Sequence, residues 1–316
     1  MINSPITVKF TATLLLALFA GSVSGQKPIV ANEQRAIPQC DNSNTKVAAI
    51  TAIRGLKSGS FISNLTADKF RVSSDREVFE VQCFSTIDEP LTVGIIIDLS
   101  SSIKKSSLTA AIRGVRKFMG NSNPRNTYFF VGFSGRPSLL LKSTNDTNQI
   151  DAFLANATGF QTRGKTAFHD AIGFAIGNLP VESSHRRVFL IFSDGEDNNS
   201  ENGSRDALKK KLRDLSVRTY IATFITPRES ITQEMIFNRI GLRRFAAETR
   251  GVFFTAEKET VVTDYFAQLG MRMRNEYRIG FNPAEIQEKW RPLTFEVKVP
   301  KDFEQISITG SEAFYY

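Results

Sequence analysis

The sequence predicts an α/β protein with a doubly wound, mostly parallel sheet and a small flanking β subdomain. Between residues 91 and 275, apolar strand-like runs such as "LTVGIIIDL" alternate with segments whose apolar residues recur at helical spacing. This alternation is typical of a doubly wound sheet. Short β-like runs without helices lie on both sides, in residues 46–90 and 276–316. Because the ends of compact domains often lie close together, we expect these two flanks to pack as one β subdomain.

The first 25 residues predict a signal peptide. Lys9 is followed by the apolar run "FTATLLLALFA" and then by the small residues "GSVSG". This order is the layout of an export signal, with cleavage expected near Gly25. The run is shorter than the roughly 20 residues of a membrane span, although an uncleaved membrane anchor is the alternative. No second long apolar segment follows. We therefore expect a mature chain without a transmembrane segment that is secreted, periplasmic or at the cell surface.

Residues 26–45 are polar and aperiodic, which predicts a flexible leader. The leader contains Cys40, and Cys83 lies in the strand-like run "REVFEVQCF". In an oxidising compartment two such cysteines often form a disulfide, although two unrelated thiols are the alternative.

The net charge of +8 is carried by Lys and Arg residues that are spread along the chain. This distribution does not indicate a nucleic-acid module. The positive charge favours acidic partners or simply maintains solubility.

The elements of the α/β region follow one another in regular order. The first strand, "LTVGIIIDL", is a continuous apolar run of the buried parallel type. Further strands are expected at "TYFFVGF", at "SLLLK" as a possible edge, and at "VFLIF", "VRTYIATFI" and "VFFTA". Gly251 is expected to end the helix before "VFFTA" as its C-cap. A longer helical region is predicted at "ITQEMIFNRIGLRRFAAETRG". The other helices are predicted from five sets of apolar residues at helical spacing: Leu108, Ile112, Val115 and Met119; Ile150, Phe153 and Leu154; Phe168, Ile172, Ala175 and Leu179; Leu208, Leu212 and Leu215; and Val262, Phe266, Leu269 and Met273.

Oxygen-bearing side chains follow the first buried strand. Asp98, Ser100 and Ser102 form the pattern D-x-S-x-S. A carboxylate and two hydroxyls are hard ligands that suit Mg²⁺ or Mn²⁺. Zinc is disfavoured because the two histidines, His169 and His185, have no ligand partner at the usual spacing. A Ser/Asp-rich helix N-cap is the alternative interpretation.

Two more oxygen donors are expected at the same place. Thr166 lies in a loop before a helix, and Asp194 ends the strand "VFLIFSD". In a doubly wound sheet the loops at the carboxyl ends of the strands meet at one edge, where such folds bind their ligands. The loops of Asp98, Thr166 and Asp194 are expected to meet there.

These motifs resemble the von Willebrand factor type A (VWA) domain. D-x-S-x-S, "TAFHDAI" and "IFSDGEDN" match the five positions of that family's metal-ion-dependent adhesion site, and the resemblance spans about residues 91–274. The segments "LTADKFRV" and "YRIGFNP…FYY" more loosely resemble the flanks of the bacterial VWFA-related acidobacterial-type proteins. The resemblance implies one Mg²⁺ or Mn²⁺ ion bound by Asp98, Ser100, Ser102, Thr166 and Asp194.

The family's mechanism implies a non-enzymatic adhesion module, and the predicted signal peptide implies that it is exported. A protein partner supplies a carboxylate to the open position of the ion. Two protein carboxylates against a dication leave little excess negative charge, so the ion still attracts an outside anion. Four basic residues lie near the ligands in sequence: Lys104, Lys105, Arg163 and Lys165. They either form a basic rim that attracts the partner or are ordinary solvated side chains.

Two enzymatic alternatives compete with this interpretation. The segment "GFQTRGKT", Gly159 to Thr166, fits the P-loop pattern G-x-x-x-x-G-K-T. A P-loop, however, must follow a strand, and the preceding "NQIDAFLANAT" has helical spacing. "SSIK", Ser101 to Lys104, fits the S-x-x-K pattern of a serine hydrolase, but neither K-T-G nor a G-x-S-x-G elbow is present. The acidic run "DGEDNNSENG" does not have the spacing of a calcium loop and is interpreted as a solvated loop.

Overall fold

The computed structural model describes residues 37–315 except 41–46, 56–58, 75–76, 181–184, 195–196, 202–203, 225–232, 257, 283–289, 300–305 and 311–312. The predicted signal peptide and most of the predicted leader lie outside these residues. No helix within the described part is both long and apolar enough to cross a membrane.

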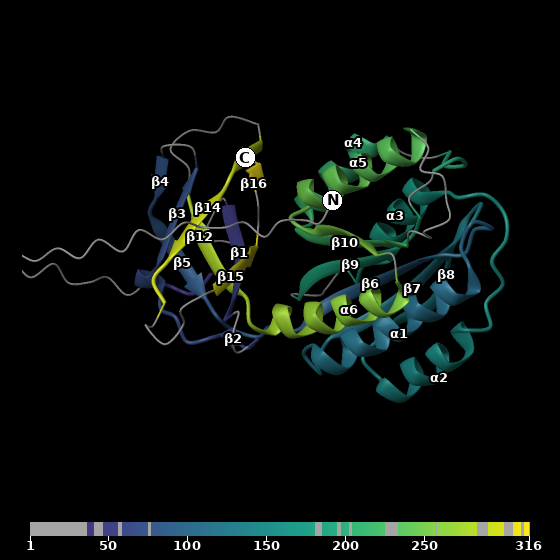
Figure 1. The fold of residues 1–316 in the computed structure, drawn as a ribbon, viewed down its shortest axis with the longest axis horizontal. Coiled ribbons are helices and arrows are strands. Elements are labelled where there is room, and N and C mark those ends of the chain that lie inside the picture. The colour runs from purple at the N-terminus through teal and green to yellow at the C-terminus, as the bar shows by residue number, and fades with distance from the viewer. Residues whose placement is uncertain are drawn as a thin grey trace, which may run out of the picture.

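A six-stranded sheet forms the centre of the larger unit (Figure 1). Its strand order is β11-β10-β9-β6-β7-β8, and every neighbouring pair is parallel except β7 and β8. The predicted α/β fold with a mostly parallel sheet is therefore confirmed, and "SLLLK" lies in the antiparallel edge strand. The strands are β6 (Leu91–Asp98), β7 (Thr127–Phe133), β8 (Pro137–Thr144), β9 (Arg186–Phe192), β10 (Val217–Phe224) and β11 (Val252–Ala256).

Helices cover both faces of this sheet (Figure 1). Side chains alternate along β6, so Ile95 and Ile97 face one core whereas Ile96 faces the other. The first core contains α1 (Lys105–Asn121), α2 (Thr147–Ala157) and α6 (Glu259–Arg274). The second contains α3 (Phe168–Gly177), α4 (Arg205–Asp214) and α5 (Gln233–Glu248).

The two flanks of the chain share sheets in the smaller unit. β1 pairs with β12 on one side and β15 on the other, and β12 also pairs with β5. A second sheet has the order β14-β3-β4, and β13 pairs with β16. The bounds are β1 (Val47–Gly55), β2 (Phe61–Ile62), a 3-10 turn η1 (Ala67–Lys69), β3 (Phe70–Ser74), β4 (Glu77–Phe79), β5 (Val81–Ser85), β12 (Tyr277–Phe281), β13 (Trp290–Pro292), β14 (Thr294–Val297), β15 (Ile306–Gly310) and β16 (Ala313–Tyr315).

The run "REVFEVQCF" is not a single strand. β4 and β5 are separated at Glu80 and belong to different sheets. The chain changes sheets there, so one periodic run in the sequence serves two layers. Cys83 lies in β5 and is joined to Cys40 by a disulfide, which ties the end of the leader to this unit.

Helix α5 ends differently from the expectation for Gly251. Arg250 adopts the left-handed conformation at φ 59°. The Arg250 N–H donates to the Ala247 carbonyl at 2.9 Å, and the Gly251 N–H donates to the Ala246 carbonyl at 2.9 Å. This pair of bonds is a Schellman motif in which Arg250 takes the position usually given to glycine. Gly251 is needed for space instead, because a Cβ atom there would lie 1.7 Å from the Thr219 carbonyl oxygen.

Candidate metal centre

Strand β6 delivers Asp98 to the carboxyl edge of the central sheet. Its side chain is 1% exposed. One carboxylate oxygen accepts the Ser100 N–H at 2.8 Å, and the other accepts the Ser193 hydroxyl at 2.7 Å. Helix α1 begins after Lys104, its N-cap residue, which makes no side-chain capping bond. The D-x-S-x-S motif is therefore not a helix cap, and that alternative is wrong.

The loop that carries Thr166 is bonded to the loop after β6. The Arg163 N–H donates to the Leu99 carbonyl at 2.8 Å, and the Ser101 N–H donates to the Gly164 carbonyl at 3.0 Å. Gly164 has φ +84°, a backbone conformation that side chains disfavour. These bonds hold the second loop against the first, and Thr166 is 2% exposed.

The third loop, which follows β9, forms hydrogen bonds with both the N–H group and the carbonyl group of Thr166. Asn198 accepts the Thr166 N–H through its side-chain oxygen at 2.9 Å. The backbone N–H groups of Asn198 and Asn199 both donate to the Thr166 carbonyl at 3.0 Å. The loops of Asp98, Thr166 and Asp194 are thus joined to one another by hydrogen bonds.

The electrostatics of this edge favour a cation. Burial raises the pKa of Asp98 to about 7, and the nearby charge of Asp194 raises it as well. The Ser100 and Ser102 hydroxyl oxygens lie 3.0 Å apart. A divalent ion would offset the repulsion between the carboxylates, and hydroxyls add neutral oxygen donors of the kind that Mg²⁺ and Mn²⁺ accept. Within the described residues no group of three or more His, Cys, Asp or Glu side chains could hold a metal, so a site here depends on its hydroxyls.

The edge is open to solvent on one side. Ser102 is exposed and Asp194 is partly buried, whereas Asp98 and Thr166 are buried. Lys104, Arg163 and Lys165 are exposed on the same two loops. A ligand arriving from solvent would therefore meet Ser102 and Asp194 first.

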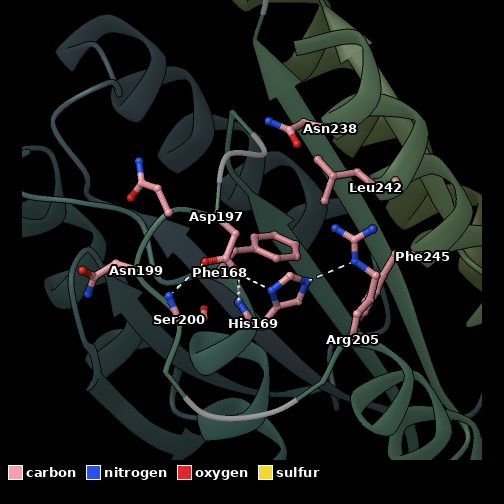
Figure 2. A pocket seen from close by; sticks show the side chains of 11 residues that line it. Phe168, His169, Asp197, Asn199, Ser200, Arg205, Asn238, Leu242 and Phe245 are labelled. Atoms are coloured by element: carbon pink, nitrogen blue, oxygen red, sulfur yellow. Dashed lines mark hydrogen bonds and ion pairs between the residues drawn. The ribbon is translucent and has the colours of Figure 1, made fainter. Parts of the chain in front are cut away.

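A pocket of about 450 Å³ adjoins the third loop. Figure 2 shows its polar side: the Nδ1 atom of His169 contacts the Asp197 carboxylate, and Arg205 lies on the other side of the His169 ring. Burial alone would raise the pKa of Asp197, but the hydrogen bonds from His169 and Ser200 and the charge of His169 together outweigh burial and lower it to about 2. The apolar part of the lining is formed by Phe168, Leu242 and Phe245.

Sequence analysis missed several of the residues that build this edge. Asp197 and Asn198 belong to the acidic run that was interpreted as a solvated loop. That interpretation is wrong for Asp197, whose side chain is 13% exposed. Ser193, which bonds Asp98, directly precedes Asp194, and this adjacency in "FSDGEDN" is the one signal that pointed to it.

The enzymatic alternatives lack the geometry they need. The P-loop-like segment from Gly159 to Thr166 follows helix α2 rather than a strand. For a Ser-His-Asp site, a serine hydroxyl would have to contact the ring nitrogen of His169 opposite Asp197. That nitrogen instead accepts from Arg205 Nε at 3.4 Å. Ser101, the first residue of S-x-x-K, donates its hydroxyl to the Gly164 carbonyl.

Comparison with known families identifies the α/β unit. Residues 93–196 match the model of the von Willebrand factor type A domain. This part of the chain is therefore similar to VWA domains. The matched residues include β6, the loop of Thr166 and Asp194, and domains of this family generally act as protein-interaction modules rather than as enzymes.

Solved structures that are similar to this chain differ widely from it in sequence. A von Willebrand factor type A protein from Catenulispora acidiphila is 13% identical, with 87% of this chain and 74% of that chain covered and a TM-score of 0.50. The conserved hypothetical protein BatB from Bacteroides thetaiotaomicron is 16% identical over 58% of this chain and 98% of that chain, with a TM-score of 0.45.

A third structure is that of proximal thread matrix protein 1 from the mussel byssus, described with a zinc-occupied MIDAS motif. It is 14% identical, with 62% of this chain and 48% of that chain covered and a TM-score of 0.48. A search of curated proteins finds no match.

Proposed function

We propose that this chain is an exported, non-enzymatic binding module that recruits a protein partner through one Mg²⁺ or Mn²⁺ ion. The ligands would be Asp98, Ser100, Ser102, Thr166 and Asp194. The observation that carries this proposal is the hydrogen bonding among the three loops, which gathers their oxygen donors at one solvent-open edge. The similarity to VWA domains supports a role in protein interaction.

The chemistry of these residues suits a bound hard dication, because without one two carboxylates would lie close together uncompensated. Asp98 is buried with its pKa raised to about 7, partly by Asp194, and both groups would be stabilised by a positive ion between them. Ser193 would hold the second oxygen of Asp98 in place through its hydroxyl at 2.7 Å. Such outer contacts orient ligands, and their loss commonly weakens metal binding by about 10- to 100-fold.

The bound ion would supply an open coordination position that accepts a carboxylate oxygen from the partner. The exposed ammonium and guanidinium groups of Lys104, Arg163 and Lys165 would attract the acidic surface that carries it. This contribution is expected mainly in the association rate and to weaken as salt is added.

Substitution of Asp98 by Asn tests the metal site by removing the ligand's charge while keeping its shape. Asn keeps the shape of Asp98, so its amide would still accept from the Ser100 N–H and donate to the Ser193 oxygen. We expect Mn²⁺ binding, measured by calorimetry on the full chain after EDTA treatment, to weaken by about 100-fold or more. The metal-free melting temperature should stay equal or rise, because the repulsion with Asp194 is removed.

Two further variants make this test specific. Asp151→Asn removes an exposed carboxylate on α2 and should leave Mn²⁺ binding unchanged. Ser193→Ala should weaken Mn²⁺ binding less than Asp98→Asn does, because it removes a contact to a ligand rather than a ligand. Equal Mn²⁺ affinity in Asp98→Asn and in the unchanged chain would refute the proposed site. Parallel titrations with Mg²⁺ and Zn²⁺ establish which ion is preferred.

The partner requires a separate experiment. Proteins that the full chain retains in Mg²⁺, and loses both in EDTA and in the Asp98→Asn variant, are the expected partners. Their binding should fall when their acidic residues are changed to amides. If a partner remained bound through both treatments, the ion would not be the contact.

A further inference from the structure

A second site lies at the opposite edge of the central sheet, where the parallel strands begin. A small cavity of about 70 Å³ is lined there by the starts of β9 and β10, the turn between α5 and β11, and strand β12. Within the described residues its lining contains no carboxylate. It contains six arginines: Arg186, Arg187, Arg213, Arg218, Arg250 and Arg278.

Arg250 stands out among these residues. Its guanidinium has no hydrogen-bond or ion-pair partner among the residues that the structure describes. Burial lowers the pKa of Arg250, and the charges of Arg278 and Arg218 lower it further. An arginine that is desolvated beside two like charges is stabilised by an anion.

The backbone of Arg250 carries a cost of its own. Its φ of 59° lies in the left-handed region, which glycine adopts freely and most other residues avoid. The Schellman motif that ends α5 accounts for this backbone conformation. A binding role for the side chain is indicated instead by its partly buried guanidinium, which lies beside the charges of Arg278 and Arg218 in the cavity.

The neighbouring Arg218 is held in a fixed orientation. It donates to both carboxylate oxygens of Glu276, at 2.9 and 3.0 Å. Glu276 also accepts from Arg186 at 3.1 Å, so one carboxylate is shared by two arginines. Arg186 also pairs with Glu89 at 3.6 Å, and Arg213 pairs with Glu248 at 3.8 Å. These carboxylates offset part of the positive charge around the cavity, and none of them pairs with Arg250.

We propose that this cavity binds one small tetrahedral oxyanion of the phosphate or sulfate class. The volume of about 70 Å³ is equivalent to roughly five to seven water positions, which suits an anion of five heavy atoms. Guanidinium groups match oxyanions in geometry and charge. The anion would join Arg218 of β10, Arg250 of the α5–β11 turn and Arg278 of β12, and so link the α/β unit to the smaller β unit.

The site is independent of the candidate metal centre, which lies at the carboxyl edge of the same sheet. The test uses the full chain in sodium phosphate, sodium sulfate, sodium acetate and sodium chloride at matched ionic strength. Phosphate or sulfate at about ten times its dissociation constant should raise the melting temperature by about 3 °C above its value in chloride. Calorimetry with inorganic phosphate measures the same binding directly.

Arg250→Gln should remove this stabilisation by phosphate, and Arg250→Lys should retain part of it because it keeps the charge. Arg113→Gln, at an exposed position on α1, removes one charge elsewhere and should leave the phosphate effect unchanged. Circular dichroism of each variant in chloride establishes that it is folded. If Arg250→Gln does not fold, the comparison of the unchanged chain with Arg250→Lys serves instead.

Two results would overturn the proposal. One is a melting temperature that phosphate and sulfate raise no more than chloride does. The other is a phosphate effect of equal size in Arg250→Gln. Equal stabilisation by acetate would show that any carboxylate serves and would contradict the assignment to a tetrahedral oxyanion.

Discussion

Asp197 accepts bonds from three groups around one side chain. It is paired with the His169 ring, and it accepts the backbone N–H groups of His169 and Ser200 at 3.1 Å each. These contacts fix the third loop against the start of α3, beside the peptide of Thr166. Asp197 therefore supports the candidate metal centre without being one of its proposed ligands.

The lowered pKa of Asp197, about 2, predicts a pH dependence of stability. An unfolded Asp titrates near 3.9, so the contribution of Asp197 is complete above about pH 4 and is lost as the pH falls toward 2. Asp197→Asn should lower the free energy of unfolding by on the order of 1 kcal/mol at pH 5, after allowance for solvent screening. The difference from the unchanged chain should shrink between pH 4 and 2.

Urea unfolding at a series of pH values measures this difference. The matched control is Asp151→Asn, because Asp151 is an exposed carboxylate on α2. Its difference from the unchanged chain should be small at every pH. A constant difference for Asp197→Asn between pH 5 and 2.5 would show that the ionised form of Asp197 contributes nothing to stability.

At the scale of elements, the connection from α5 to β11 depends on the close approach of Gly251 to β10. Gly251→Ala would place a Cβ atom 1.7 Å from the Thr219 carbonyl oxygen, so the backbone would have to move. We expect a loss of about 3 kcal/mol or more in the free energy of unfolding. The measurement is chemical denaturation followed by circular dichroism.

Gly120 provides the matched control because it is also a glycine next to a helix end. It lies in the last turn of α1, and a Cβ atom there would have nothing within 4 Å. Gly120→Ala should leave stability unchanged or raise it by up to about 1 kcal/mol, because alanine favours the helix and restricts the unfolded chain. Effects of the same sign and size at both glycines would contradict the steric argument.

At the scale of the whole molecule, Glu276 connects the α/β unit to the smaller β unit. It lies between α6 and β12 and pairs with Arg218 of β10 and Arg186 of β9. Burial alone would raise the pKa of Glu276, but these arginines outweigh burial and lower it. The junction between the two units is thus a buried charge cluster as well as a covalent link.

Removal of the Glu276 charge should be costly because Arg218 would remain buried without its partner. We expect Glu276→Gln to lower the free energy of unfolding by about 3 to 5 kcal/mol, and the double variant Arg218→Met/Glu276→Leu to lose less. Asp214→Asn breaks an exposed pair with Lys210 at 2.9 Å and should cost less than about 1 kcal/mol. Similar losses in Glu276→Gln and Asp214→Asn would refute a dominant role for the buried cluster.

The sequence by itself determined the α/β class. It placed Asp98, Ser100, Ser102 and Asp194 at or just after the ends of predicted strands, and Thr166 in a loop before a predicted helix. Those signals are local: a buried parallel strand is a continuous apolar run, and the residue that ends it is known from the run itself. The layout of elements from β6 to α6 could therefore be predicted. The position of "REVFEVQCF" in two different sheets could not, because periodicity does not state which layer a strand joins.

Only the tertiary structure decided which loops meet and which groups lose their water. The bonds of Thr166 to Asn198 and of Asp98 to Ser193 join segments far apart in the chain. The local sequence of one segment does not predict that it contacts the other. The arginine cavity is the clearest case, since Arg187, Arg218, Arg250 and Arg278 come from four separate elements. Spread along the sequence they are ordinary basic residues. Folding brings them into one cavity, where burial and mutual repulsion make an anion favourable.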